Sequence, residues 1–201
     1  TLHSNTFEWD NACDGESWRK THNYEHHTYT NILHKDRDYG YGLLRLSHDQ
    51  EWSPKFRFQF LYYVVLSSVF QWGVALHELE AENIPKDPAH LKKKIPFLKA
   101  FFKKSGRQVF KDYIFFPLLA GPFALSVLTG NFAANLIRNL WASTVIFCGH
   151  FPEGVETFDE KECENESRGH WYYRQILGSA NFTGKKWLHI LSGHLSFQVE
   201  H

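Results

Sequence analysis

The stretch that decides the fold runs from Tyr113 to Cys148 and reads YIFFPLLAGPFALSVLTGNFAANLIRNLWASTVIFC. It contains two apolar runs, Tyr113–Thr129 and Phe132–Cys148, which only Gly130 and Asn131 separate. Each run is close to the roughly 20 residues that a helix needs to cross a bilayer core. Glycine and asparagine are good turn residues, so we expect the chain to reverse there. The stretch therefore predicts a transmembrane helical hairpin at about residues 110–149.

The same hairpin also fits a buried helical core in a soluble protein. Arg138 and Asn139 favour this alternative, because a charge at the centre of a bilayer is costly unless it faces the protein interior. The mean hydropathy of −0.42 points the same way, but it averages in large polar ends. Both interpretations predict an all-α fold.

A first apolar run, Phe56–Leu76, precedes a basic amphipathic segment, Leu91–Lys111. Positive charge favours the cytoplasmic side of a membrane, so the basic segment should lie there. The hairpin then crosses out and back and returns its end to that side. The histidines before and after the hairpin lie together on the cytoplasmic side only if the first apolar run does not cross the membrane. We therefore expect an interfacial or re-entrant helix at about residues 56–76.

The composition argues against several classes of function. Basic and acidic residues both number 22, so no net charge indicates a nucleic-acid partner. Three cysteines without paired spacing argue against a disulfide framework or a zinc ribbon. The chain has no methionine and no signal sequence, and it opens and stops abruptly, so we expect it to be one domain, residues 1–201, cut from a longer protein. Its 13 histidines exceed what packing requires.

The segment RKTHNYEHHTYTN places three histidines, His22, His26 and His27, on one predicted helix, since Trp18–Asn31 lacks Gly and Pro. Residues i and i+4 share a helix face, and i+5 lies about 100° further round. Imidazoles gathered in this way can bind iron, zinc, copper or nickel. A polar surface helix with chance histidines is the alternative.

Two further elements add histidines: His150 directly after the hairpin, and the terminal segment WLHILSGHLSFQVEH with His189, His194 and His201. Other site types fit poorly, because the chain has no H-E-x-x-H, no EF-hand loop, no G-x-S-x-G and no phosphate-binding glycine loop. The sequence therefore predicts a histidine-rich metal site.

HNYEHH followed by TYTN, and SFQVEH at the end, resemble the second and third histidine boxes, H-x-x-(x)-H-H and Q-x-x-H-H, of membrane fatty acid desaturases. The likeness covers most of the chain, and WRKTHNYEHHTYTNILHKDRDYGYG is especially similar to bacterial acyl-lipid or acyl-CoA desaturases. It implies a membrane-embedded helical domain whose cytoplasmic helical cap carries the metal site.

The resemblance also implies a chemistry. Family members hold two irons through histidines, and with O2 they remove two hydrogens from an acyl chain and introduce a cis double bond. The implied partners are membrane lipid, an acyl-CoA or acyl-lipid substrate, and ferredoxin or cytochrome b5 with its reductase as electron donor. Side chains alone cannot oxidise an unactivated C–H bond, so a metal must supply the oxidant.

By resemblance, the metal ligands are His22, His26, His27, His150 and His201. Gln198 stands where some subfamilies have another histidine, so it reaches the metal through water or orients a ligand. The acidic candidates for hydrogen bonds to ligand imidazoles are Glu25, Asp36, Asp38 and Glu200. His170 and His194 match no ligand position.

Two departures from the pattern are expected to matter: the first box is not in the chain, and the last histidine of the third box would follow His201. We expect residues 1–201 alone to be inactive. A lipid hydroxylase or ketolase on the same scaffold, a membrane protein with a decayed site, and a soluble zinc-binding helical domain remain as alternatives.

Overall fold

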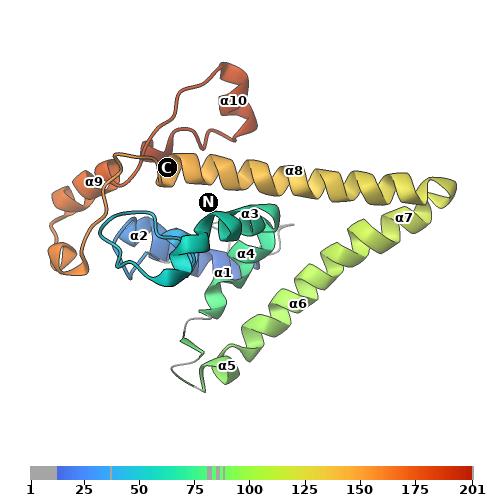
Figure 1. Ribbon diagram of the computed structural model, residues 1–201, viewed down its shortest axis with the longest axis horizontal. Coiled ribbons are helices and arrows are strands. Elements are labelled where there is room, and N and C mark those ends of the chain that lie inside the picture. Colours follow the sequence, from blue (N-terminus) through green and yellow to red (C-terminus); the bar gives the residue numbers. More distant parts are fainter. Residues whose placement is uncertain (1–12, 37, 81–82, 85–86, 88, 201) are drawn as a thin grey trace. The chain divides into compact units, whose positions relative to one another are not determined.

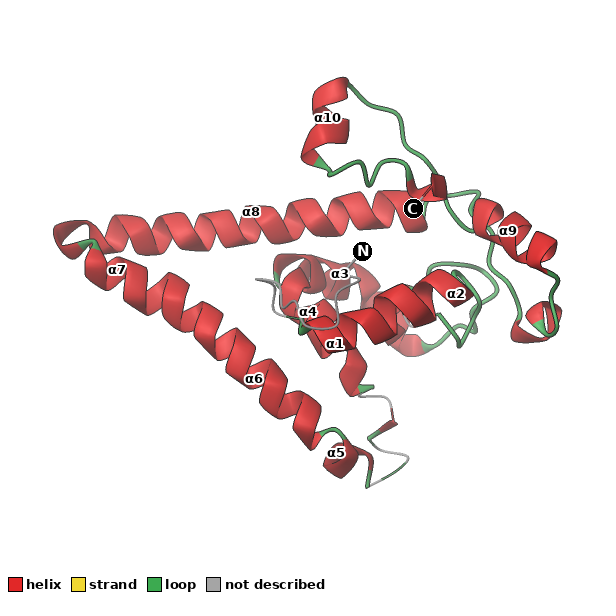
Figure 2. Cartoon of the chain, turned by 180° about the vertical axis from the view of Figure 1, so that it is seen from behind, coloured by secondary structure: helices red, strands yellow, loops and turns green. Residues whose placement is uncertain are grey.

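The computed structural model describes residues 13–36, 38–80, 83–84, 87 and 89–200. In these residues the chain forms helices and loops without a β-strand (Figure 2), apart from isolated bridges between Ile32 and Phe158 and between Asn181 and Phe197. The predicted all-α class is confirmed.

The chain divides into two compact units. The first, here the helical unit, comprises Thr1–Thr21 and Leu66–Leu140, and the second, here the histidine unit, comprises His22–Val65 and Trp141–His201. The α-helices (Figure 1) are α1 Gly15–Trp18, α2 His27–Tyr29, α3 Gln59–Ser68, α4 Phe70–Leu76, α5 His90–Lys93, α6 Ile95–Phe110, α7 Phe116–Leu119, α8 Ala124–His150, α9 Arg168–Leu177 and α10 Lys186–Leu191. The π-helical segments are Arg19–His26 and Lys111–Phe115.

The hairpin forms, but its turn is not at Gly130–Asn131. Both residues lie inside α8, and the chain reverses instead at the 3-10 turn Gly121–Phe123, between α7 and α8 (Figure 1). Gly121 has a φ of +54°, which glycine adopts without strain, and Pro122 suits the start of the following turn. Within α8, the Asn131 side chain donates to the Asp112 carbonyl at 2.6 Å, so its amide ties the two arms of the hairpin together.

The first apolar run is not one helix. It breaks at Val69, where the segments Pro54–Ser68 and Phe70–Leu79 meet at a bend of 100°. Among the described residues no single helix is both long and apolar enough to cross a membrane, and only this bent pair reaches that limit when taken together.

Asn139 supports the bend. A helix break leaves backbone groups without helical partners. The Asn139 amide donates to the Ser68 carbonyl at 2.9 Å, and its oxygen accepts from the Gln71 N–H at 3.4 Å. Arg138, the residue before Asn139, donates to the side-chain oxygen of Gln71. The two polar residues that interrupt the apolar run therefore bond to protein groups within the helical unit.

The interiors of the two units differ in kind. The helical unit has a small apolar cluster in which Cys13, Ala75 and Phe101 are buried. The largest side chains that are fully buried all lie in the histidine unit, and four of the five are polar: Arg174, Ile32, Asn31, Ser143 and Ser196. Buried polar side chains must find hydrogen-bond partners, so the histidine unit is organised by directional contacts.

Candidate metal centre

Three histidines come from one continuous helix, in which the π-helical segment Arg19–His26 leads into α2. In π-helical turns each N–H bonds to the carbonyl five residues back, so residue i+5 lies over residue i. His27 therefore returns to the face of His22 instead of lying further round, and their Nε2 atoms are 3.2 Å apart. The ring of His26 lies 5.3 Å from that of His22 and 5.6 Å from that of His27.

The fourth histidine, His150, is the last residue of α8 and is buried. Its ring centroid lies 4.8 Å from that of His26. The structure therefore brings together four of the five histidines that the sequence singles out as metal ligands. The fifth, His201, lies outside the described residues.

Asp36 fixes the orientation of His26. Its buried carboxylate lies 3.0 and 3.1 Å from His26 Nδ1, and it also accepts the backbone N–H groups of Asn31 and Asp38 at 2.8 and 2.9 Å. A carboxylate on Nδ1 holds the proton there and leaves Nε2 as the ligand atom. The expectation that Asp36 bonds to a ligand imidazole agrees with this geometry.

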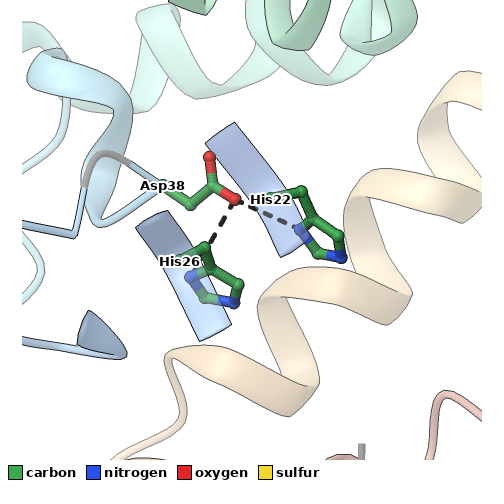
Figure 3. A group of neighbouring side chains, drawn as sticks. All are labelled: His22, His26 and Asp38. Atoms are coloured by element: carbon green, nitrogen blue, oxygen red, sulfur yellow. Dashed lines mark ion pairs between the residues drawn. The ribbon is translucent and has the colours of Figure 1, made fainter. Parts of the chain in front are cut away.

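Asp38 lies on the Nδ1 side of two of these histidines. Its carboxylate is 3.6 Å from His22 Nδ1 and 3.9 Å from His26 Nδ1 (Figure 3). Ligand atoms of His22, His26 and Asp38 all lie within 4.8 Å of one another. Both distances are to Nδ1, whereas Nε2 is the ligand atom of His26, so Asp38 lies where its carboxylate supports the imidazoles and not where it would bind the metal.

The two histidines that face Asp38 differ in protonation. Burial lowers the pKa of His22, and hydrogen bonding to Asp38 only partly offsets this. Burial acts in the same direction on His26, but the charge of Asp36, its hydrogen bond and the charge of Asp38 outweigh it and raise the pKa to about 9. Metal binding requires neutral imidazoles, so it would displace a proton from His26 but not from His22.

Helix α9 holds the end of the histidine helix. Arg174, fully buried, donates to the carbonyls of Thr30 and Thr28 at 3.0 and 2.9 Å, and Gln175 donates to the His27 carbonyl at 2.9 Å. The last carbonyls of a helix have no partner within it, so these donors replace the missing backbone bonds.

A salt bridge holds Arg174 in turn. Its guanidinium makes two hydrogen bonds to the Glu166 carboxylate, at 2.8 and 3.1 Å. Arg174 was not predicted from the sequence. Arg174 lies three residues after Trp171 and four before Gly178, which places it on the same face of α9 as these two residues. A charged residue on a face that should be buried is the sequence feature that could have indicated its role. Trp171 itself donates to the Thr28 carbonyl at 3.1 Å.

Asn31 ends the histidine helix with a φ of +57°, a conformation that asparagine tolerates better than most residues. Its side-chain amide donates to the carbonyls of Glu156 and Gly178, at 3.1 and 2.8 Å. The amide therefore joins the end of this helix to the segments on both sides of α9.

Gln198 approaches the centre from the end of the chain and is only 4% exposed. Its Nε2 donates to the Leu195 carbonyl at 2.7 Å, and its buried Oε1 has no hydrogen-bond partner among the described residues. The side chain passes over Gly149, where a Cβ atom would lie 2.2 Å from Gln198 Cγ. Glycine before His150 is thus required for Gln198 to reach this position.

A cavity of about 410 Å³ adjoins these groups. Its walls include three of the histidines and residues of α9, and its full lining is Asn23, His26, His27, Thr28, Thr30, His150, Trp171, Tyr172, Gln175, Ser179, Gln198 and Val199. Gln198 belongs to this lining together with His26, His27 and His150.

The remaining candidates have other surroundings. His189 bonds through Nδ1 to the Ser196 hydroxyl at 2.6 Å and through Nε2 to the Gly184 carbonyl at 3.0 Å. His170 pairs with Glu166 on the surface, and His194 is exposed. Glu25 is half-buried on the histidine helix.

The donor set fits a metal such as iron. Four imidazoles supply nitrogen ligands that iron accepts, and the carboxylates of Asp36 and Asp38 support them from the Nδ1 side. The amide oxygen of Gln198 is a further buried acceptor next to them. No thiolate belongs to the clustered group within the described residues, which makes a zinc–thiolate site unsuitable.

Comparison with known proteins agrees with this chemistry. The sequence profile of the fatty acid desaturase family matches residues 12–201, and the chain belongs to this family. No solved structure matches the chain.

Among curated relatives, an NADPH-dependent stearoyl-CoA 9-desaturase of Mycobacterium tuberculosis is 47% identical over 204 residues, which cover 100% of this chain and 48% of the relative. An sn-1 linoleoyl-lipid 6-desaturase of Synechocystis is 30% identical, over 92% of this chain and 52% of the relative. An acyl-lipid (7-3)-desaturase of Rebecca salina is 25% identical, over 92% and 42%. The chain spans about half the length of the curated relatives it matches.

Proposed function

We propose that this chain carries most of the di-iron centre of an O2-dependent fatty acid desaturase. The observation that carries the proposal is the convergence of His22, His26, His27 and His150 from two separate helices. His201 completes the proposed ligand set of the chain, and Asp38 supports the imidazoles of His22 and His26 from the Nδ1 side. Two irons, when bound, would supply the oxidant that an unactivated C–H bond requires.

The protein's own residues orient the ligands and exclude water. Asp36 keeps the proton on Nδ1 of His26, so that Nε2 faces the centre. Gln198 supplies a buried amide oxygen among the residues that line the cavity, and Glu25 on the same helix stays a candidate for supporting an imidazole. Burial of His26, His150 and Gln198 limits the access of water to a reactive oxidant.

In the proposed reaction one C–C single bond of the acyl chain becomes a cis double bond. The chain gives up two hydrogens, the electron donor supplies two electrons, and two protons come from solvent, so that O2 is reduced to two molecules of water. The most similar relative reported above is named a stearoyl-CoA desaturase that depends on NADPH. An acyl-CoA substrate is therefore proposed, with NADPH as the source of electrons through a reductase and ferredoxin or cytochrome b5.

The fatty acid desaturase family is membrane-associated. We place the hairpin of about residues 110–149 in the membrane and the helix pair of about 56–76 at its interface, within a single desaturase domain. The basic residues of α5 and α6 favour the cytoplasmic side for the metal centre. The 100° bend at Val69 supports an interfacial position for the first run.

Iron quantification in the full-length protein tests the proposal. His27→Ala and His150→Ala should each lose bound iron and desaturase activity, whereas His170→Ala, a surface control on α9, should retain both. Retention of iron and activity in the two ligand variants would refute the assignment. Mass spectrometry of the product should show a loss of two hydrogens, because a gain of one oxygen would instead identify a hydroxylase.

A further inference from the structure

Residues 181–199, here the α10 loop, close on themselves next to the candidate site. Phe182 N donates to the Ser196 carbonyl at 3.0 Å, Asn181 pairs with Phe197, and Val199 N donates to the Asn181 side chain at 3.0 Å. Figure 1 shows α10 at the tip of this loop, which projects beyond α9 within the histidine unit. The loop therefore has its own fixed base.

The loop directs its polar groups inward. Ser192 and Ser196 are buried, and Ser196 bonds to His189. Both ring nitrogens of His189 are engaged, and its ring stacks on Phe197 with centroids 4.9 Å apart. Gly184 packs directly on Leu188, where a Cβ atom would lie 2.4 Å from the leucine side chain.

The apolar side chains of α10 point outward instead. Trp187 is 56% exposed, Ile190 57% and Leu191 65%. Their i, i+3, i+4 spacing places them on one face of the helix. A loop in water normally shows the opposite arrangement, because burying a side chain of this size stabilises by about 1.5–3 kcal/mol. This exposed face is therefore suited to an apolar partner.

The charges around α10 indicate the chemistry of that partner. Lys185 and Lys186 directly precede Trp187 and are exposed. From Ser167 to Val199 the sequence contains no Asp or Glu, whereas the preceding residues 153–166 contain six Glu and one Asp. A tryptophan beside lysines, with aliphatic residues one turn on, is the pattern of a helix that lies in the interface of an anionic bilayer.

We propose that α10 rests on an anionic lipid surface, with Trp187, Ile190 and Leu191 inserted among the lipids and Lys185 and Lys186 against the headgroups. This inference rests on the membrane location in the proposed function. Because the loop ends at Gln198, its contact with lipid holds this part of the candidate site at a fixed depth.

Site-directed fluorescence in liposomes tests the inference. An environment-sensitive thiol label is attached to Ile190→Cys in the full-length protein, in a background in which Cys148, Cys163 and any cysteine outside residues 1–201 are replaced by Ser. Burial raises the pKa of the remaining Cys13 thiol to about 12, so that thiol should stay unlabelled. Glu164→Cys, exposed in the acidic segment, is the matched control, and Leu125→Cys reports on the hairpin.

In anionic liposomes, lipids that carry a doxyl quencher should quench the Ile190 label several-fold more than the Glu164 label. Lys185→Gln with Lys186→Gln should remove the dependence on anionic lipid. A water-like emission from the Ile190 label would overturn the inference, and so would a shielded emission that doxyl lipid does not quench, because protein would then cover α10. If the Leu125 label is also unquenched, the membrane hairpin of the proposed function fails as well.

Discussion

The two units of this chain differ in which side chains they bury and which they expose. In the histidine unit the most deeply buried side chains are mainly polar, and Arg174, Asn31 and Ser196 bond to backbone or side-chain groups. In the helical unit large apolar side chains remain exposed along the hairpin, among them Leu118 at 74% and Leu125 at 72%. Directional bonds can hold ligands in place to within a fraction of an ångström, whereas an apolar surface only requires apolar surroundings.

The comparison predicts that loss of one buried polar contact harms the histidine unit more than the helical unit. The largest effect is expected for Arg174→Met. It leaves Glu166 and the carbonyls of Thr28 and Thr30 without their donor, which should lower the free energy of unfolding by about 3–5 kcal/mol. Denaturant unfolding of the purified protein in detergent measures the change. The exposed Arg168→Met on the same helix should change little, and equal losses in the two variants would contradict the role of Arg174.

Asn31→Gly is expected to have the next largest effect. Glycine keeps the φ of +57° but removes the amide that donates to Glu156 and Gly178, so we expect a loss of about 2 kcal/mol. Asn165→Gly is a matched control, since Asn165 has the same φ and is exposed. The same unfolding measurement decides the outcome, and an unchanged stability of the Asn31 variant would show that the amide bonds contribute nothing.

Asn139→Leu makes the corresponding change in the helical unit. It removes the bonds to the Ser68 carbonyl and the Gln71 N–H, and a loss of about 1 kcal/mol is expected, as for polar contacts between membrane helices. Unfolding in detergent should rank this variant above Arg174→Met in stability, with Ile137→Ala as the exposed control on α8. A reversed ranking would break the comparison.

Glu166→Gln tests the same buried pair from the acidic side, through an effect that depends on pH. The hydrogen bond from Arg174 lowers the pKa of Glu166, so the unfolded state binds its proton more tightly. The resulting stabilisation is present above the unfolded pKa, about 4.3, and is lost as the pH falls through the folded pKa. The wild-type Tm should therefore exceed that of Glu166→Gln near neutral pH and converge with it in acid. Glu164→Gln, a surface control, should follow the wild type at every pH.

Sequence reasoning predicted the helices and most of the candidate ligands because both depend on local patterns. The H-x-x-x-H-H spacing identified His22, His26 and His27, and the end of an apolar run identified His150. The prediction of a turn at Gly130–Asn131 was wrong. The chain turns at Gly121–Pro122, which also favours a turn, and the Asn131 side chain bonds to the Asp112 carbonyl from within α8. Arg174 escaped prediction because its partner Thr30 is 144 residues away along the chain.

The π-helical turns of the histidine helix have a consequence for how such sites evolve. A π-helical ring encloses one residue more than an α-helical ring, so an insertion of one residue can be absorbed without rotating the helix that follows. H-x-x-H-H on an α-helix and H-x-x-x-H-H on a π-helix can therefore present the same three imidazoles to one centre. The extra residue of the longer histidine box is taken up by a π-helical turn. The histidines that follow it therefore keep their positions relative to the metal centre.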